Sequence, residues 1–518
     1  MTSRSEITFY LNGQRQDLSG PDLLMPVADF LRTRRLLTGT KIVCAEGDCG
    51  ACTALIAHPE KSSTKTAASR DGRHFQSLNT CIYPVLALDG CHLVTVEGLT
   101  GGLTGELTNG PAEKQKPATL HPVQDAMAKC HGSQCGFCTP GFVCAMTAMI
   151  EEAQRKGKTG PLAEKKIKNA LTGNLCRCTG YLPIIEAAKT LEPAKITSLR
   201  ARYFSKEERG TLSKLTKQPV RIETQNLLGE KLLILLPTTM NDAVKLRARY
   251  KDLKIVAGAT DLGVQVNKGR TKLQAVMSLQ NIPSLWQIKR SKSTTLVGAR
   301  VSLTALQQDL EKHDPELNRI LNIFASPQIK NTGTLVGNVV NGSPIGDTIP
   351  YLMAMDAKVL ARGPGGKRAI AMSEFYLGYK KLALKPGELV EGIEIPHLKN
   401  SERIKLYKVS LRKDLDISAV TLAIRLGGRK TIETARIVFG GVGPTVFRLK
   451  DVEKSWLGQS LTQEQVETLL QDLSKQIAMK VNPISDVRGS RDYRLRLCRS
   501  LLLKAGAELK SELRAEAP

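Results

Sequence analysis

The sequence predicts a multidomain α+β protein, and three observations support this fold class. The chain has 518 residues, and at roughly 100–200 residues per domain this length indicates three or four domains. The predicted elements change along the chain: short strands with one helix come first, then helices alone, then strands and helices that alternate. Two segments without hydrophobic periodicity separate these regions and are predicted to be linkers.

Composition and charge restrict the class of protein. Hydrophobic residues make up 41% of the chain and charged residues 24%, as in ordinary globular proteins. The N-terminus lacks an apolar signal region, and the densest aliphatic run, 232–236, is far too short to span a bilayer. The net charge of +26 is spread widely, and aromatic residues, which would stack on bases, make up only 4%. We therefore expect a cytoplasmic protein with no nucleic-acid partner and no membrane contact.

Residues 1–97 are predicted to form a small mixed sheet with one helix across it. Apolar residues alternate from Ile7 to Leu11, and Asn12-Gly13 follows as a hairpin signal. A helix is predicted at 27–35, and further strands at 53–57 and 92–96. The Gly-, Thr- and Pro-rich segment 98–119 is predicted to be a linker.

The first set of cysteines lies within this region. Cys44, Cys49 and Cys52 follow the pattern C-x4-C-x2-C, and Cys81 completes a set of four. This is the plant-type spacing for a [2Fe–2S] cluster. The intervening Gly47 would give the loop the dihedral angles that a tight wrap around a cluster needs. A zinc site remains the alternative, although zinc more often binds two separated Cys-x-x-Cys pairs.

Residues 121–195 are predicted to be helical. Four prolines each stand just inside the start of an apolar-periodic segment, where proline is tolerated. The predicted helices are roughly 122–131, 140–154, 161–171 and 183–190. The second set of cysteines precedes two of them: Cys135 and Cys138 the second helix, Cys176 and Cys178 the fourth. Facing turns would make a four-thiolate site, and taken alone this set also fits zinc.

The remainder of the chain is predicted to be α+β. Residues 196–230 are basic and polar and are predicted to be a linker, 231–396 to form one domain and 403–515 a last domain. No G-x-G-x-x-G follows a strand, and no GxxxxGK[ST] occurs. Two glycine-bearing stretches, 255–269 and 326–347, could instead offer backbone N–H groups to a diphosphate, or could be polar surface loops.

Three motifs in order, EGDCGACT, QCGFCTPG and NLCRCTGY, resemble those of the molybdenum hydroxylase family, which includes xanthine dehydrogenases, aldehyde oxidases and carbon monoxide dehydrogenases. The resemblance implies a β-grasp ferredoxin-like domain and a four-helix domain, each with one [2Fe–2S] cluster. It implies that 231–396 is an FAD-binding domain and 403–515 a C-terminal flavoprotein domain. It also implies that Gln134, which precedes the first cysteine of the second set, contacts a molybdopterin.

The family resemblance extends to the two glycine-bearing stretches and implies a set of FAD contacts. Ala259 stands where a second Gly is frequent, and Val336 replaces the first Gly of a GGN-type segment. The implied FAD-binding residues are Ile255, Val256, Ala257, Gly258, Ala259, Thr260, Asp261, Leu262, Phe324, Thr334, Leu335, Val336, Gly337, Asn338, Asp347, Val390 and Lys408.

The organisation of the chain is similar to that of the small subunits of bacterial xanthine dehydrogenases. The resemblance implies a large molybdopterin-binding partner in a heterodimer or heterotetramer, NAD as the electron acceptor and a role in purine catabolism. Electrons would pass from the partner through the second cysteine set, then the first, to FAD; no side chain of this chain need act as a catalytic acid or base. The alternatives are the same role in an aldehyde or N-heterocycle hydroxylase, and a non-enzymatic, zinc-bearing basic scaffold.

Overall fold

The computed structural model describes residues 3–58, 74–101 and 119–515, which divide into two compact units. Unit 1 comprises residues 1–286 and 326–333, and unit 2 comprises residues 287–325 and 334–518. The division lies inside the predicted FAD-binding segment: the stretch 255–269 belongs to unit 1, and the stretch 326–347 is divided between the units after Gly333. The predicted linker 98–119 lies mostly outside the described residues. No helix in the described ranges is both long and apolar enough to cross a bilayer.

The first sheet of unit 1 has the order β2-β1-β5-β3-β4, in which β1 and β5 are parallel and the other pairs antiparallel. Its strands are β1 Ile7–Leu11, β2 Gln14–Leu18, β3 Thr53–Ala57, β4 Gln76–Asn79 and β5 His92–Val94, with short helices η1 Pro21–Leu24, η2 Val85–Leu88 and α2 Val96–Leu99. The predicted hairpin is present, since Asn12 and Gly13 both have positive φ, 51° and 87°. Helix α1, Val27–Arg34, buries Phe30 and Leu31.

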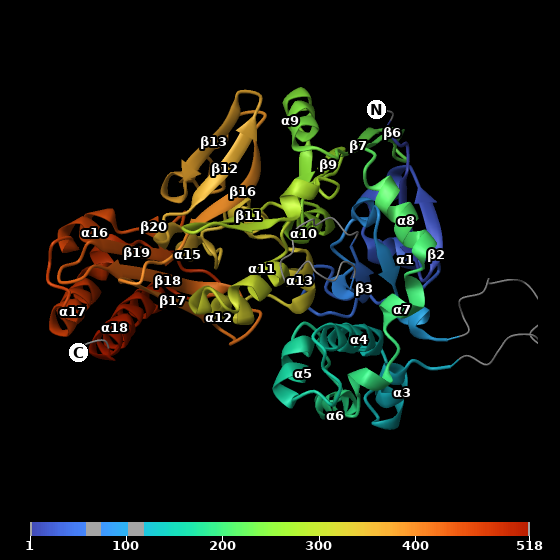
Figure 1. The fold of residues 1–518 in the computed structure, drawn as a ribbon, viewed down its shortest axis with the longest axis horizontal. Helices are drawn as coiled ribbons and strands as arrows, with labels where there is room; N and C mark the ends of the chain where they lie inside the picture. The colour runs from blue at the N-terminus through green and yellow to red at the C-terminus, as the bar shows by residue number, and fades with distance from the viewer. Residues whose placement is uncertain (1–2, 59–73, 102–118, 516–518) are drawn as a thin grey trace, which may run out of the picture. The chain divides into compact units, whose positions relative to one another are not determined.

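The four helices predicted within 121–195 are present, and Figure 1 shows them gathered in one part of unit 1. They are α3 Pro122–Lys129, α4 Thr139–Arg155, α5 Glu164–Leu171 and α6 Leu182–Lys189, followed by η4 Pro193–Lys195. Helix α5 begins three residues later than predicted, so Pro161 precedes the helix rather than opening it. Buried residues such as Phe142 and Ile184 pack between the helices.

The segment 196–230, predicted to be a linker, folds into two short helices and a strand. It contains α7 Leu199–Tyr203, α8 Lys206–Leu215 and β6 Val220–Gln225. The side chains of Ser198 and Ser205 cap the two helices. The helices are too short to show periodicity, and their order comes from long-range contacts: the His92 ring bonds the Glu208 carboxylate at 2.7 Å, and both side chains are buried.

A second sheet of unit 1, in the order β6-β7-β9-β8, follows. Strands β7, β8 and β9 are parallel, and β6 is antiparallel to β7. The elements are β7 Lys231–Leu236, α9 Met240–Arg249, β8 Lys254–Val256, α10 Thr260–Asn267, β9 Ala275–Ser278 and η5 Pro283–Trp286, and α13 Pro327–Thr332 also belongs to this unit. The residues of this sheet share one apolar core with the first sheet, which includes Phe9, Ile234 and Val276.

Unit 2 begins with an antiparallel sheet in the order β10-β11-β16-β12-β13. Its strands are β10 Ile288–Arg290, β11 Thr294–Gly298, β12 Lys358–Gly363, β13 Gly366–Ala371 and β16 Leu389–Pro396, with the small hairpin β14 Tyr376–Gly378 and β15 Lys381–Leu382. Its helices are α11 Leu303–Leu310, α12 Pro315–Ile323, α14 Leu335–Val340, α15 Ile349–Ala354 and η6 Met372–Glu374.

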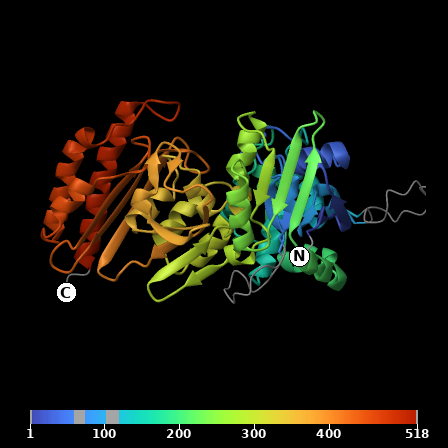
Figure 2. The ribbon, with the colours of Figure 1, turned by 90° about the horizontal axis from the view of Figure 1, so that it is seen from above.

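The last part of unit 2 is an antiparallel sheet, β17-β18-β19-β20, against helices. Its elements are β17 Glu402–Ser410, β18 Ser418–Gly427, β19 Thr434–Gly440, β20 Phe447–Arg448, α16 Lys450–Trp456, α17 Gln463–Lys480 and α18 Arg491–Ala515. All ten residues of β18 are buried, which indicates that both faces of this strand are covered. Figure 2 shows the two red C-terminal helices along this sheet. Residues 403–515 thus contain both strands and helices, as predicted.

Candidate iron–sulfur and flavin sites

The first cysteine set is brought together by one loop and the end of β4. Cys52 and Cys81 are buried, and Cys44 and Cys49 are partly exposed. The thiol of Cys44 lies within hydrogen-bond reach of the thiols of Cys49 and Cys81, and that of Cys52 within reach of Cys81. Accepting these bonds lowers the pKa of Cys44 and of Cys52, while donating them raises the pKa of Cys49 and of Cys81. The four predicted ligands therefore converge.

The loop that carries the first three thiols can be built only with glycine at two positions. Gly47 and Gly50 have φ of +86° and +68°, and a Cβ on Gly50 would lie 2.2 Å from the carbonyl oxygen of Gly173. The Asn79 side chain donates to the Gly47 carbonyl at 2.6 Å, and the Glu46 N–H donates to Cys44 Sγ at 3.5 Å. Backbone amides pointing at sulfur are what an iron–sulfur cluster requires of its loop.

The second cysteine set is formed by the turns before α4 and α6. Cys178 Sγ lies 3.7 Å from Cys135 Sγ and 3.8 Å from Cys176 Sγ. Burial and a hydrogen bond to Cys176 raise the pKa of Cys138 to about 12. Burial opposes ionisation of Cys176, but hydrogen bonds from Thr179 outweigh it and lower its pKa to about 7. The pairs predicted to face one another do so.

Both donor sets fit a binuclear cluster. Each set brings four thiols, the donors that iron–sulfur clusters use, close to one another. A [2Fe–2S] cluster divides its four thiolates between two irons, so two thiolate pairs are what it requires. The donor chemistry and the glycine-lined loop thus fit the predicted clusters, and the ligand assignments remain predictions.

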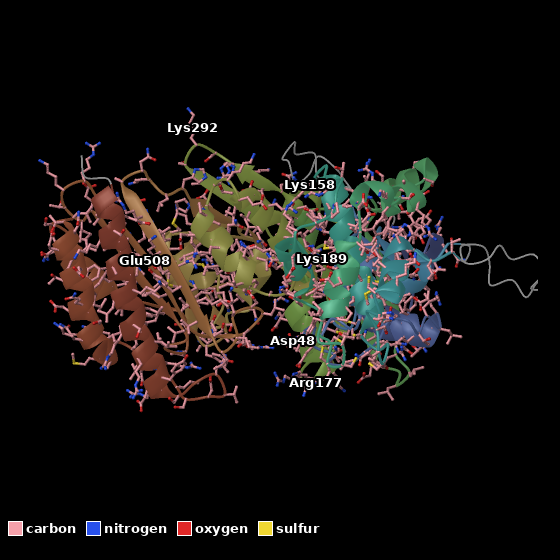
Figure 3. All side chains as sticks on the ribbon, turned by 90° about the horizontal axis from the view of Figure 1, so that it is seen from below. Asp48, Lys158, Arg177, Lys189, Lys292 and Glu508 are labelled. Carbon is pink, nitrogen blue, oxygen red and sulfur yellow. The ribbon has the colours of Figure 1, made fainter. Side chains whose placement is uncertain are left out.

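The two cysteine-bearing segments are hydrogen-bonded to one another. The N–H of Leu175, adjacent to Cys176, donates to the carbonyl oxygen of Cys49 at 3.0 Å. The Asn174 side chain donates to the Gly50 carbonyl at 3.0 Å and accepts from Gln328 at 2.8 Å. Figure 3 shows the labelled side chains of Asp48 and Arg177, one from each segment, on the same side of unit 1. Sequence analysis missed Asn174 and Gln328 because nothing local distinguishes them.

The predicted flavin-binding stretch 255–262 of unit 1 is a tight strand-to-helix turn between β8 and α10. Ala259 has φ of +63°, which explains why Gly would be favoured at this position. A Cβ on Gly258 would lie 2.2 Å from the carbonyl oxygen of Thr332, so the turn is packed against backbone. The turn therefore has a fixed backbone conformation, set by the positive φ of Ala259 and the close packing of Gly258, and is not a loose polar loop.

The predicted flavin-binding residues of unit 2 include Thr334, whose hydroxyl caps α14 by accepting from the Gly337 N–H at 2.9 Å. Asn338 accepts from the Thr348 hydroxyl at 2.7 Å. The side chain of Val336 is buried, and Gly337 is exposed. Phe324, at the end of α12, is partly exposed, and Val390 is buried in β16 opposite Ala361.

Lys408 and Asp347 form a buried ion pair at 2.7 Å, with side chains only 1% and 7% exposed. Lys408 Nζ also donates to the Asp416 carbonyl and to the Ser418 hydroxyl, each at 2.8 Å. Together with the Asp347 carboxylate, these groups give one acceptor for each of the three N–H donors of the Lys408 ammonium group. Lys408 is thus held in place by protein groups, and in turn it holds Asp347.

Comparison with known proteins identifies three domains. Residues 108–189 match the family described as a [2Fe-2S] binding domain, residues 229–398 the FAD binding domain in molybdopterin dehydrogenase, and residues 405–509 the CO dehydrogenase flavoprotein C-terminal domain. The chain is 29% identical to a xanthine dehydrogenase of Drosophila pseudoobscura pseudoobscura over 98% of its length, and 29% identical to a xanthine dehydrogenase/oxidase of Gallus gallus over 96%. It spans 40% of the length of each of these relatives.

Two solved structures resemble part of the chain. A carbon monoxide dehydrogenase chain from Hydrogenophaga pseudoflava aligns with a TM-score of 0.49 and 23% identity, covering 54% of this chain and 97% of that one. A chain of quinoline 2-oxidoreductase from Pseudomonas putida 86 aligns with a TM-score of 0.48 and 21% identity, covering 54% and 96%.

Proposed function

We infer that this chain, which belongs to the molybdenum hydroxylase family and carries its iron–sulfur and flavin domains, is the electron-transfer subunit of a xanthine dehydrogenase. Electrons would pass from a molybdenum site on a partner through the set Cys135, Cys138, Cys176 and Cys178, then through Cys44, Cys49, Cys52 and Cys81, to FAD and NAD. The cofactors supply this redox chemistry, and the protein positions them. The order β2-β1-β5-β3-β4 supports the β-grasp interpretation of 1–97.

The observation that carries this proposal is the direct contact between the two cysteine-bearing segments. The Leu175 N–H and the Asn174 side chain donate to the Cys49 and Gly50 carbonyls, and a Cβ on Gly141 would lie 2.3 Å from the Gly50 oxygen. Segments packed this closely keep two bound clusters near one another. Such proximity is needed for electron transfer and has no role in two independent structural zinc sites.

The exposed end of the second cysteine set supports a partner docking there. Gln134, Cys135 and Cys178 are exposed, whereas Cys52 and Cys81 of the first set are buried. Large apolar side chains near these cysteines in sequence are exposed as well, namely Phe137, Leu175 and Leu182, which are 49%, 47% and 65% exposed. Apolar side chains gathered around a candidate redox site fit a protein interface. We propose that the molybdopterin-binding subunit covers this surface and contacts Gln134.

The isolated chain should oxidise NADH with an artificial acceptor but should not react with xanthine. The flavin side is present in this chain, whereas xanthine would react on the partner. In stopped-flow absorbance, xanthine should leave the isolated chain oxidised and should bleach it once the molybdenum subunit is added. Leu182→Asp should slow this bleaching at least tenfold, and Leu457→Asp, a comparably exposed leucine of unit 2, should not.

Three results would revise this proposal. Turnover of xanthine by the chain alone would overturn the subunit assignment. A competent complex that ignores xanthine but accepts an aldehyde or another N-heterocycle would change the substrate and leave the electron-transfer role in place. A colourless protein that contains zinc would favour the basic scaffold instead.

Substitution of Gly337 by Val should yield a protein that keeps its iron but loses most of its FAD. Gly337 is exposed, and an added Cβ would lie 2.9 Å from the Thr334 hydroxyl that caps α14, so this hydroxyl, itself a proposed flavin contact, must shift. The added methyl groups would also occupy space proposed for the flavin. Flavin absorbance per iron measures the effect. Gly365→Val, at an open position of the same unit, is the matched control, and normal FAD content in the Gly337 variant would exclude this position from the cradle.

A further inference from the structure

Helix α10 joins the predicted flavin-binding turn to the loops of the first cysteine set. The helix begins at Thr260, directly after Ala259, and ends at Asn267. The Asn267 side-chain amide donates to two carbonyl oxygens, those of Ala45 and Cys81, each at 2.7 Å. One amide thus bridges the two segments that carry Cys44 and Cys81. Asn267 belongs to neither predicted site, and its sequence position offers no sign of this contact.

The helix is also in backbone contact with the same segment. A Cβ on Gly263 would lie 2.0 Å from the carbonyl oxygen of Ile82. Ile82 follows Cys81 directly and is 3% exposed. Only glycine allows this approach, so α10 has a defined position against the Cys81 segment. An ion pair between Lys268 and Glu46 lies on the surface beside it, and a surface pair of this kind contributes little.

The bond from Asn267 to Ala45 acts on a peptide group that also contacts a predicted cluster ligand. The carbonyl of Ala45 and the N–H of Glu46 belong to one peptide unit, and that N–H donates to Cys44 Sγ at 3.5 Å. A donor on the carbonyl polarises the peptide and strengthens its N–H as a donor. A stronger N–H···S bond stabilises the more negative, reduced cluster and so raises its reduction potential.

We propose that Asn267 is a positioning residue that raises the reduction potential of the first cluster through the Ala45–Glu46 peptide, while α10 ties that cluster's loops to the flavin-binding turn. The proposal rests on the assignment of the first cysteine set to a [2Fe–2S] cluster. Because Asn267 is solvent-exposed, water can replace some of its effect, and the expected shift is moderate.

Redox titration of the purified chain, followed by the electron paramagnetic resonance of both clusters, tests this. Asn267→Leu, which has similar volume and no donor, should shift the reduction equilibrium of the first cluster by up to about tenfold toward the oxidised form, or about 59 mV for one electron. Asn267→Asp should shift it further, because a carboxylate would face two carbonyl oxygens. The second cluster should not change in either variant and serves as the internal reference.

Gln265→Leu is the matched control, since this amide lies on the same helix and bonds Asp261 instead of the cluster loops. It should leave both potentials unchanged. If the Leu variant does not assemble the first cluster, Asn267→Ser is titrated in its place. The same result is expected: a lower potential for the first cluster and an unchanged potential for the second. Unchanged potentials in the Asn267 variants, or equal shifts of both clusters, would overturn the inference. Absence of any [2Fe–2S] signal in the unmodified protein would instead overturn the proposed function.

Discussion

Substitution of Cys49 by Ser should abolish one of two [2Fe–2S] signals and leave the other intact. The thiol of Cys49 lies against that of Cys44 in the first set, and no other thiol of the chain is spaced to replace it. The second set is held by the turns before α4 and α6, and the Leu175 N–H bonds the backbone carbonyl of Cys49, which a serine retains. Low-temperature electron paramagnetic resonance and iron content, which should fall by about half with two irons per cluster, measure the loss.

The converse variant and a buried control make this test specific. Cys178→Ser should remove the other signal and keep the one that Cys49→Ser loses. Cys91→Ser alters a fully buried thiol outside both sets and should retain both signals. Survival of both signals in Cys49→Ser, or zinc in place of iron, would show that the ligand assignment is wrong.

Replacement of Lys408 by Met should destabilise unit 2 by about 3–5 kcal/mol, because it leaves the buried carboxylate of Asp347 without its counter-charge. The Ser418 hydroxyl would remain as a partner of Asp347 but carries no charge. FAD content should fall as well, since Asp347 and Lys408 both belong to the proposed flavin contacts. Chemical denaturation of the purified variant gives the free energy of unfolding, and flavin absorbance gives the FAD content.

Two further variants separate stability from flavin binding. Lys408→Met combined with Asp347→Asn removes both charges, and it should recover most of the lost stability while FAD content stays low. Lys475→Ala breaks an exposed pair with Asp472 and should cost no more than about 1 kcal/mol. Full FAD occupancy in the double variant would show that this pair supports the fold but has no part in the flavin site.

Features that depend on neighbours in sequence were predictable. The spacing of Cys44, Cys49 and Cys52 is a local property, because one short loop must direct all three thiols inward, and the structure brings them together with Cys81 as expected. The Asn12-Gly13 turn follows from the rare ease with which these residues adopt positive φ. The helices of 121–195 follow from periodic apolar residues, although Pro161 proved to precede its helix.

Features that depend on partners distant in sequence appeared only in the tertiary structure. Asn267 bonds carbonyls 222 and 186 positions away, and Gln328 bonds Asn174 across 154 positions. A polar side chain in isolation carries no sign of such a partner, since its bonds could equally be made to water. The short helices of the segment 196–230 likewise depend on distant groups, such as His92, which bonds Glu208. The sequence by itself therefore predicted the first iron–sulfur site from its cysteine spacing, and the second cluster and the flavin contacts from family resemblance. Only the tertiary structure showed how the cofactor-binding segments contact one another, because these hydrogen bonds join residues that come close together only when the chain folds.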